Sequence, residues 1–301
     1  MGTEPHRIKT ITELHRIAGY DKPQHPLISI LNLEGLANNT DITSVLFDFY
    51  VISLKRGCDK LYYGQQKYDF DEGLMAFFAP GQILRGEESS VPARLEGWML
   101  FIHPDFLWGT SLANKIKNYE YFDYSVSEAL FLSDKEEKLI NEIVTNIKNE
   151  YHTNIDKFSQ NIIISHLETL LNYADRFYQR QFITRKITNH QVLDRLEKLL
   201  SDYFNDDDLI TKGLPSVQYI SDSLHVSPGY LRNLLKTLTG QSTQQHIHDK
   251  LIDKAKEKLS TTNLTVSEIA YNLGFEHMQS FSKMFKAKTK KSPLEFRQSF
   301  N

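Results

Sequence analysis

The first hundred residues contain short apolar runs separated by turn residues. The runs cover residues 27–33, 44–55, 74–84 and 95–103 and are rich in Val, Ile, Phe and Tyr. Bounded runs of this composition are typical of strands. They predict an antiparallel sheet or small barrel, preceded by an N-terminal arm that carries His6, His15 and His25.

After residue 103 the apolar spacing becomes helical. Residues 133–152 begin with a serine cap and an acidic cluster, followed by apolar residues three and four positions apart. A second predicted helix, over residues 158–180, has one apolar stripe. The stripe consists of Ile163, Leu167, Leu170, Ala174 and Phe177. Two interpretations stay open: the stripe pairs with a second copy in a homodimer, through the helices at 134–180, or it docks onto the barrel.

The last third of the chain contains a repeated unit. Residues from Ile220 onward align with those from Ile269 onward, with one extra residue in the second turn. Each copy is predicted to form a short helix, a tight turn and a second helix. Residues 242–263 connect the copies and have apolar residues at every fourth position, which predicts a helix. In the second copy, Gly274 supplies the positive φ that ends the first helix.

The apolar face of each second helix determines which residues point outward. A helix with such an outer face fits the major groove of DNA, where Arg and Lys pair with guanine and Asn and Gln pair with adenine. The alternative is that these residues form an ordinary solvated surface. The duplicated helix-turn-helix with matched surface cations favours DNA binding. The predicted DNA-contacting residues are Gly229, Tyr230, Arg232, Asn233 and Lys236 in the first copy, and His277, Met278, Gln279, Ser280, Ser282, Lys283 and Lys286 in the second.

The charge distribution agrees with this division. The chain of 301 residues has a net charge of −3, yet residues 216–301 hold 12 Lys and Arg against 7 Asp and Glu, and residues 1–215 hold 23 against 31. A basic end on an acidic chain suggests a polyanionic partner. Five lysines lie between Lys283 and Lys291. The single cysteine, Cys58, excludes an internal disulfide and fits a reducing compartment.

From about Asn189 to its end, the chain resembles the DNA-binding domain of the AraC/XylS transcription regulators. The resemblance rests on VSPGYLRNLLKTLTG, DKLIDKAKEKLSTTNLTVSEIAYNLGF and SFSKMFKAKTKKSPLEFR. It implies base or backbone contacts at seven positions. These are Gly229, Arg232, Asn233, Met278, Gln279, Ser282 and Lys283. The first copy departs from the family pattern, because His225 replaces the common glycine and Gly229 offers no side chain.

The N-terminal half resembles the same family's cupin-like domain, through FFAPGQIL and GWMLFIHPDFL. The predicted fold class is therefore α+β: a cupin-like antiparallel β-barrel followed by helices, then an all-α domain with two helix-turn-helix units. The predicted divisions are an effector-binding barrel at 1–132, a helical dimerisation region at 133–183 and a DNA-binding domain at 184–301. The resemblance implies a transcription regulator of bacterial type, cytoplasmic and associated with the nucleoid; it is expected to be an activator, with repression left open as the alternative. Its implied partners are double-stranded DNA, a second copy, a small-molecule effector and RNA polymerase.

Two other classes of function are weighed against this interpretation. A cupin metalloenzyme needs two or three histidines and a carboxylate on neighbouring strands, and among the strand-like runs only His103 qualifies. Cys58 lies in KRGCDK, which reads as a turn with no activating histidine signature. A protein-binding adaptor would use its lysines on acidic partners and show no preference among duplexes. We expect no catalytic residue, metal, cofactor, export signal or membrane span.

Overall fold

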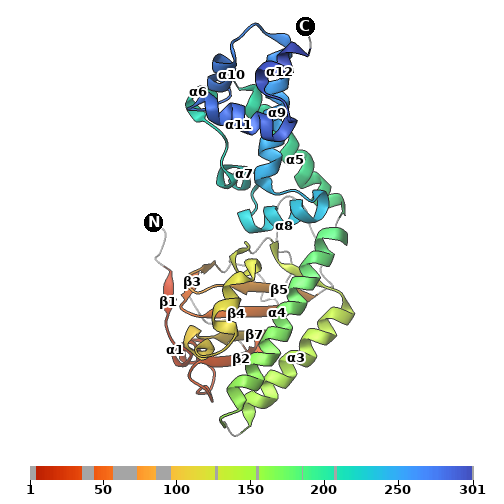
Figure 1. Cartoon of the computed structure of the whole chain (residues 1–301). Coiled ribbons are helices and arrows are strands. Elements are labelled where there is room, and N and C mark those ends of the chain that lie inside the picture. The colour runs from red at the N-terminus through yellow and green to blue at the C-terminus, as the bar shows by residue number, and fades with distance from the viewer. Residues whose placement is uncertain are drawn as a thin grey trace, which may run out of the picture. The chain divides into compact units, whose positions relative to one another are not determined.

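The computed structural model describes residues 5–35, 44–56, 73–85, 96–125, 128–153, 156–184, 186–206 and 209–299 (Figure 1). The chain divides into two compact units, Met1–Gln181 and Phe182–Asn301. The predicted turn at Cys58 lies outside the described residues.

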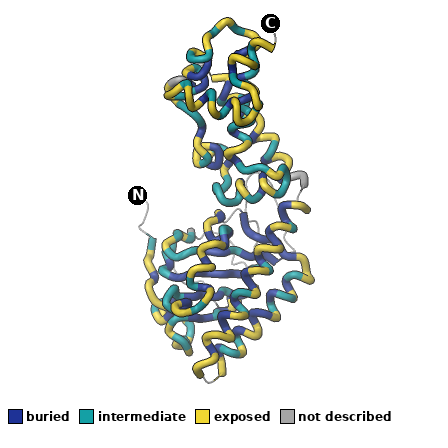
Figure 2. Tube along the Cα trace, viewed as in Figure 1, coloured by how far each residue is buried: buried dark blue, intermediate teal, exposed yellow. Residues whose placement is uncertain are grey.

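Five strands of the first unit form an antiparallel sheet in the order β2-β7-β4-β5-β8. The strands are β2 (Ile28–Asn32), β4 (Tyr50–Arg56), β5 (Gly73–Phe78), β7 (Glu96–Ile102) and β8 (Leu130–Leu132). Both faces of the central strands are buried, which explains why their sequences are nearly continuous apolar runs (Figure 2). Four of these strands confirm the predicted runs, whereas the sequence did not indicate β8.

The remaining strands form a second sheet, in the order β1-β3-β6. They are β1 (His6–Ile8), β3 (Ser44–Phe47) and β6 (Ile83–Arg85), and β1 pairs with β3 in parallel. The described strands thus form two sheets with one parallel pair, and the prediction of a single antiparallel barrel was wrong for this part of the chain.

The predicted N-terminal arm is also wrong in part, because residues 6–18 are folded. Helix α1 (Ile11–Ala18) starts at the Thr10 cap and ends at Gly19, whose φ is +77°. The imidazole of His15 is buried, with Nδ1 2.5 Å from the carbonyl oxygen of Asp21. This histidine is therefore a structural residue, hydrogen-bonded within its own unit.

An apolar cluster fills the space between β-strands of the two sheets and α1. Its buried members are Ile8, Ile11, Leu14, Leu31, Phe47, Phe49, Val51, Phe78 and Phe101. Phe47, Phe49 and Phe101 pack with ring centroids 5.1 to 5.8 Å apart. These aromatic rings are core residues, as expected for the interior of a small β-structure.

Two long helices, α3 (Asp134–His152) and α4 (Ser159–Thr184), complete the first unit (Figure 1). The apolar stripe of α4 is buried inside this unit, with Leu167, Leu170 and Ala174 fully inaccessible. Tyr121 donates a hydrogen bond to the carbonyl oxygen of Leu171 at 2.8 Å, and its ring stacks on Tyr178. The stripe therefore docks within its own unit and is not the dimer seam. Short elements lie around these helices: η1 (Leu33–Gly35), η2 (Pro104–Leu107), α2 (Leu112–Lys115), η3 (Ile116–Asn118) and η4 (Glu120–Asp123).

The second unit is helical throughout its described residues, as predicted. Its helices are α5 (Lys186–Asn205), α6 (Leu209–Lys212), α7 (Val217–Leu224), α8 (Pro228–Thr239), α9 (Thr243–Thr261), α10 (Val266–Asn272), α11 (Met278–Thr289) and α12 (Pro293–Gln298). The connecting helix α9 buries Ile247, Leu251, Ala255 and Leu259 on one face, as its sequence pattern predicts. Within the described ranges, no helix combines the length and hydropathy needed to cross a bilayer.

Candidate nucleic-acid interface

The two helix-turn-helix units have the same turn geometry. Each first helix ends in a left-handed residue, His225 at φ +58° in one copy and Gly274 at +82° in the other. The next amide closes the turn in both copies, from Val226 to the carbonyl of Ser221 and from Phe275 to the carbonyl of Ala270. The predicted role of Gly274 is confirmed. Any larger residue at position 274 would also pack too tightly, because its Cβ would lie 3.0 Å from the backbone of Gly213.

The second helices begin differently. In α8 the Ser227 hydroxyl accepts a hydrogen bond from the amide of Tyr230, with Pro228 in the first turn. In α11 the cap residue is His277, whose side chain makes no capping hydrogen bond. Amides at a helix N-terminus attract anions, so the first turn of α11 is suited to approach a phosphate.

Burial of the apolar faces fixes four outward positions in each second helix. Leu231, Leu234 and Leu235 of α8 are fully buried, as are Phe281 and Phe285 of α11. The opposite faces hold four residues each, at equivalent positions of the two copies. They are Gly229, Arg232, Asn233 and Lys236 on α8, and Gln279, Ser282, Lys283 and Lys286 on α11. We call these residues the outer faces of α8 and α11.

Most residues of the outer faces are exposed. Arg232, Lys236, Gln279, Lys283 and Lys286 are exposed. The other three residues, Gly229, Asn233 and Ser282, are half-buried. Each outer face therefore presents at least one cation together with a carboxamide, from Asn233 on α8 and from Gln279 on α11.

The remaining predicted contact residues lie beside these faces. The ring of Tyr230 packs edge-on against Phe182, with centroids 5.1 Å apart. The sulfur of Met278 accepts a hydrogen bond from the Ser267 hydroxyl at 3.0 Å, which ties the start of α11 to α10. Ser280 is exposed on the flank of α11, and His277 is exposed at its start.

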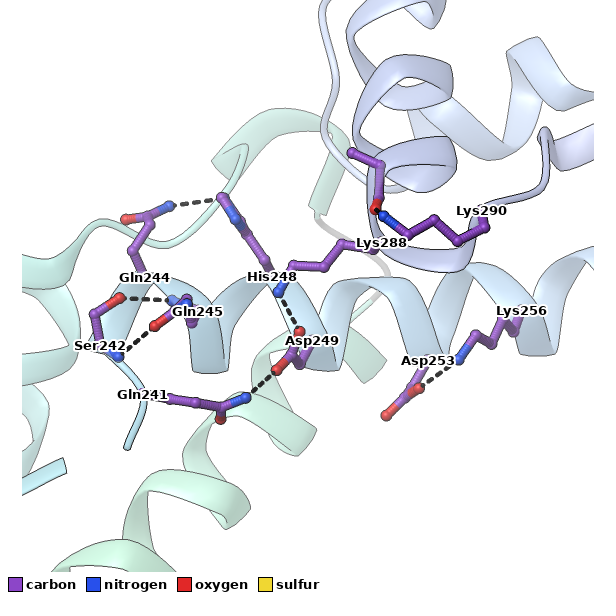
Figure 3. A network of polar contacts seen from close by, with 11 residues as sticks. Gln241, Ser242, Gln244, Gln245, His248, Asp249, Asp253, Lys256, Lys288 and Lys290 are labelled. Atoms are coloured by element: carbon purple, nitrogen blue, oxygen red, sulfur yellow. Dashed lines mark hydrogen bonds and ion pairs between the residues drawn. The ribbon is translucent and has the colours of Figure 1, made fainter. Parts of the chain in front are cut away.

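The five lysines near the C-terminus separate into different environments. Lys283 and Lys286 belong to the outer face of α11. Lys288 instead forms an ion pair with Asp249 of α9, with 2.6 Å between Nζ and Oδ1 (Figure 3). Lys290 has a left-handed backbone at the end of α11, and its Nζ donates to the carbonyl oxygen of Ala287. Charge counting alone did not reveal the pairing of Lys288.

The enzyme alternative depends on a convergent set of metal ligands. In the described part of the chain, no group of three or more His, Cys, Asp or Glu side chains is arranged to hold a metal. His103 caps η2, where its Nδ1 accepts a hydrogen bond from the amide of Asp105 at 3.2 Å. That contact gives His103 a local structural role.

Comparison with known proteins gives several matches. Residues 220–299 match a family model described as a helix-turn-helix domain. YfiF of Bacillus subtilis, an uncharacterized HTH-type transcriptional regulator, is 29% identical over 143 residues, which are 48% of this chain and 42% of that protein. The arabinose operon regulatory protein of Salmonella typhimurium is 37% identical over 94 residues, which are 27% of this chain and 34% of that protein. The C-terminal domain of the response regulator yesN from Fusobacterium nucleatum shares 27% identity over 36% of this chain and 98% of its own, with a TM-score of 0.31.

The C-terminal unit is therefore a helix-turn-helix domain with two copies of the motif. The expected resemblance to the AraC/XylS regulators is confirmed as a similarity to proteins such as the arabinose operon regulatory protein. The chain spans less than half the length of the two regulators named above. Both relatives are named as regulators.

Proposed function

We propose that this chain is a sequence-specific, DNA-binding transcription regulator. The observation that carries the proposal is the pair of equivalent outer faces on α8 and α11. Each outer face combines hydrogen-bonding groups for base edges with a cation for phosphates. A recognition helix in the major groove presents residues at these positions to the DNA.

The roles of individual residues follow from their chemistry. Arg232 and Lys283 are suited to the acceptors of guanine, and Asn233 and Gln279 to adenine. Lys236 and Lys286 lie one turn further along each helix and are placed for phosphates. Since Gly229 has no side chain, base recognition by α8 depends on Arg232 and Asn233.

Capture of genomic DNA fragments by the purified chain tests this function. The proposal predicts enrichment of a defined set of fragments that share a sequence. The adaptor alternative predicts equal capture of all duplexes, with binding that only falls as salt rises. Equal capture would reject the proposed function.

A small-molecule effector is proposed for the first unit. A groove of about 450 Å³ lies between the five-stranded sheet and α3. Its wall is rigidly held, because Arg56 makes paired hydrogen bonds to Glu137 and the Trp98 indole donates to Asn141 at 2.8 Å. A metabolite that raises the unfolding temperature of the native chain and of Trp108→Ala, but not of Trp98→Ala, would support this site. Equal shifts in all three would reject it.

A homodimer is proposed through the outer surface of α4, since its inner stripe is buried. Phe158 and Ile162 expose 56% and 41% of their surface near the start of this helix. Ile162→Glu should yield monomers in sedimentation, whereas Thr145→Glu on α3 should leave the dimer intact.

We further propose activation through contact with RNA polymerase and a location at the bacterial nucleoid, both supported only by the resemblance.

A further inference from the structure

Asp249 contacts both helix-turn-helix units through its two carboxylate oxygens. Oδ1 accepts a hydrogen bond from Nζ of Lys288, in the last turn of α11, at 2.6 Å. Oδ2 accepts from Nε2 of Gln241, in the turn directly after α8, at 2.9 Å (Figure 3). One side chain of the connecting helix therefore holds the end of each candidate DNA-reading helix.

The environment of Asp249 favours its charged form. Burial by itself would raise the pKa of this carboxyl, but the hydrogen bonds and charge of Lys288, with the hydrogen bond from Gln241, hold the pKa below its usual value. Lys288 and Asp249 are 32% and 40% exposed, so the pair is partly shielded from solvent. Charge-assisted bonds of this kind are shorter and stronger than neutral ones.

Other contacts make α9 a stable support for this carboxylate. His246, one turn before Asp249, has Nε2 2.9 Å from the Thr239 hydroxyl at the end of α8. Lys254 donates to Asn205 at the end of α5 at 2.9 Å. Helix α9 is thus held on both sides of Asp249. Movement of either helix-turn-helix unit relative to α9 would stretch the hydrogen bond to Asp249 from Gln241 or from Lys288.

We infer that Asp249 is a positioning residue that sets the separation and orientation of α8 and α11. The inference rests on the proposed function, because it requires that both helices read one duplex. Asp249 acts through Gln241 and Lys288 rather than on DNA, since a carboxylate would repel phosphates. It also withdraws Lys288 from the cations available to the DNA backbone.

The test uses the full-length chain and a duplex that this chain selects from a random-sequence pool. Affinity is then measured on that duplex and on two derivatives with one base pair added or removed between the two contacted segments. Asp253→Ala is the matched control, because Asp253 lies one turn further along α9 and pairs only locally with Lys256 at 3.4 Å. Both substitutions remove one negative charge from the same helix.

The native chain and Asp253→Ala should lose about tenfold in affinity when the spacing changes, since each misplaced contact costs about 1.4 kcal/mol or more. Asp249→Ala should bind the selected duplex about fivefold more weakly, yet lose only about twofold further on the altered spacings. Lys288→Met should reproduce this behaviour, and the double variant should be no worse than either single variant.

Three outcomes would overturn the inference. The first is a folded Asp249→Ala variant that loses as much affinity on the altered spacings as the native chain does. The second is a double variant whose loss of affinity equals the sum of the losses of the two single variants. The third is tighter binding of Asp249→Ala to every duplex alike, which would make Asp249 a repulsive charge only. If Asp249→Ala is unfolded by circular dichroism, Lys288→Met decides alone. If the native chain selects no duplex, the proposed function itself fails.

Discussion

Lys236 and Lys286 lie at equivalent positions on the two outer faces, where each is placed to contact a phosphate. Lys286→Ala should weaken binding to specific and random duplexes by the same factor. It should also reduce the slope of log affinity against log salt by about 0.9, the amount expected for one lost phosphate contact.

Filter binding at several salt concentrations measures that slope. Lys290→Ala is the control, because its ammonium turns back to its own helix end and should change the slope less. A change confined to the specific duplex would instead assign Lys286 to base recognition.

Substitution of the left-handed turn residue should have opposite effects on stability in the two copies. His225→Gly should stabilise the C-terminal unit by about 1 kcal/mol, because a non-glycine residue at positive φ costs roughly that amount. Gly274→His should destabilise it by about 2 kcal/mol or more, since strain adds to the clash with the backbone of Gly213. Both tryptophans, Trp98 and Trp108, lie in the first unit, so urea unfolding of the second unit is followed by helical circular dichroism. Equal effects of the two substitutions would contradict the shared turn geometry.

For single residues, the sequence predicts backbone conformation and burial better than it predicts side-chain contacts. The positive φ of Gly274 and the burial of Phe281 and Phe285 follow from local pattern. The link between Asp249 and Lys288 does not, because the residues are 39 positions apart and a single side-chain pair leaves no periodic signal. Tyr230 was predicted from its position alone, and its contact with Phe182 depends on a residue 48 positions earlier in the chain.

Among the elements, Arg56 of β4 and Glu137 of α3 form a polar link between the sheet and the helix. Glu137 is 5% exposed, and its carboxylate receives two hydrogen bonds from Nε and one from Nη2 of Arg56. Arg56→Met should destabilise the first unit by about 2 kcal/mol, less than for a fully buried pair because Arg56 is 45% exposed.

Tryptophan fluorescence during urea unfolding measures this loss, since both tryptophans report on the first unit. A second substitution, Glu137→Met, should restore most of the lost stability, because it removes the unpaired buried carboxylate. Additive destabilisation in the double variant would show that the charge pairing is not what holds α3 to β4.

Element boundaries in the first unit show where periodicity stops being informative. The run at 44–55 was predicted as one strand, but the chain bends at Asp48 and Phe49 and contributes β3 to one sheet and β4 to the other. Arg7 holds this bend by donating to the Asp48 carboxylate at 2.9 Å. Whether a strand changes sheet depends on such distant contacts. In the second unit, by contrast, serine or threonine caps in the sequence mark the starts of α7, α8, α9, α10 and α12.

For the whole molecule, the basic part of the chain begins at residue 216, inside the second unit, and the first unit lies wholly in the acidic part. The basic excess of residues 216–301 lies within the unit that contains both outer faces, while the acidic excess lies in residues 1–215. Since the acidic groups are largely assigned to a different unit, a negative net charge for the whole chain does not oppose binding of DNA by α8 and α11.

Selection of duplexes from a random pool, by the native chain and by two variants, tests whether α8 and α11 read separate parts of one duplex. The native chain should enrich a site with two recognised segments about ten base pairs apart, one turn of the double helix. Asn233→Ala should relax the sequence of one segment and Gln279→Ala that of the other. Enrichment of no sequence, or relaxation of the same segment by both variants, would contradict the claim that α8 and α11 read separate parts of one duplex.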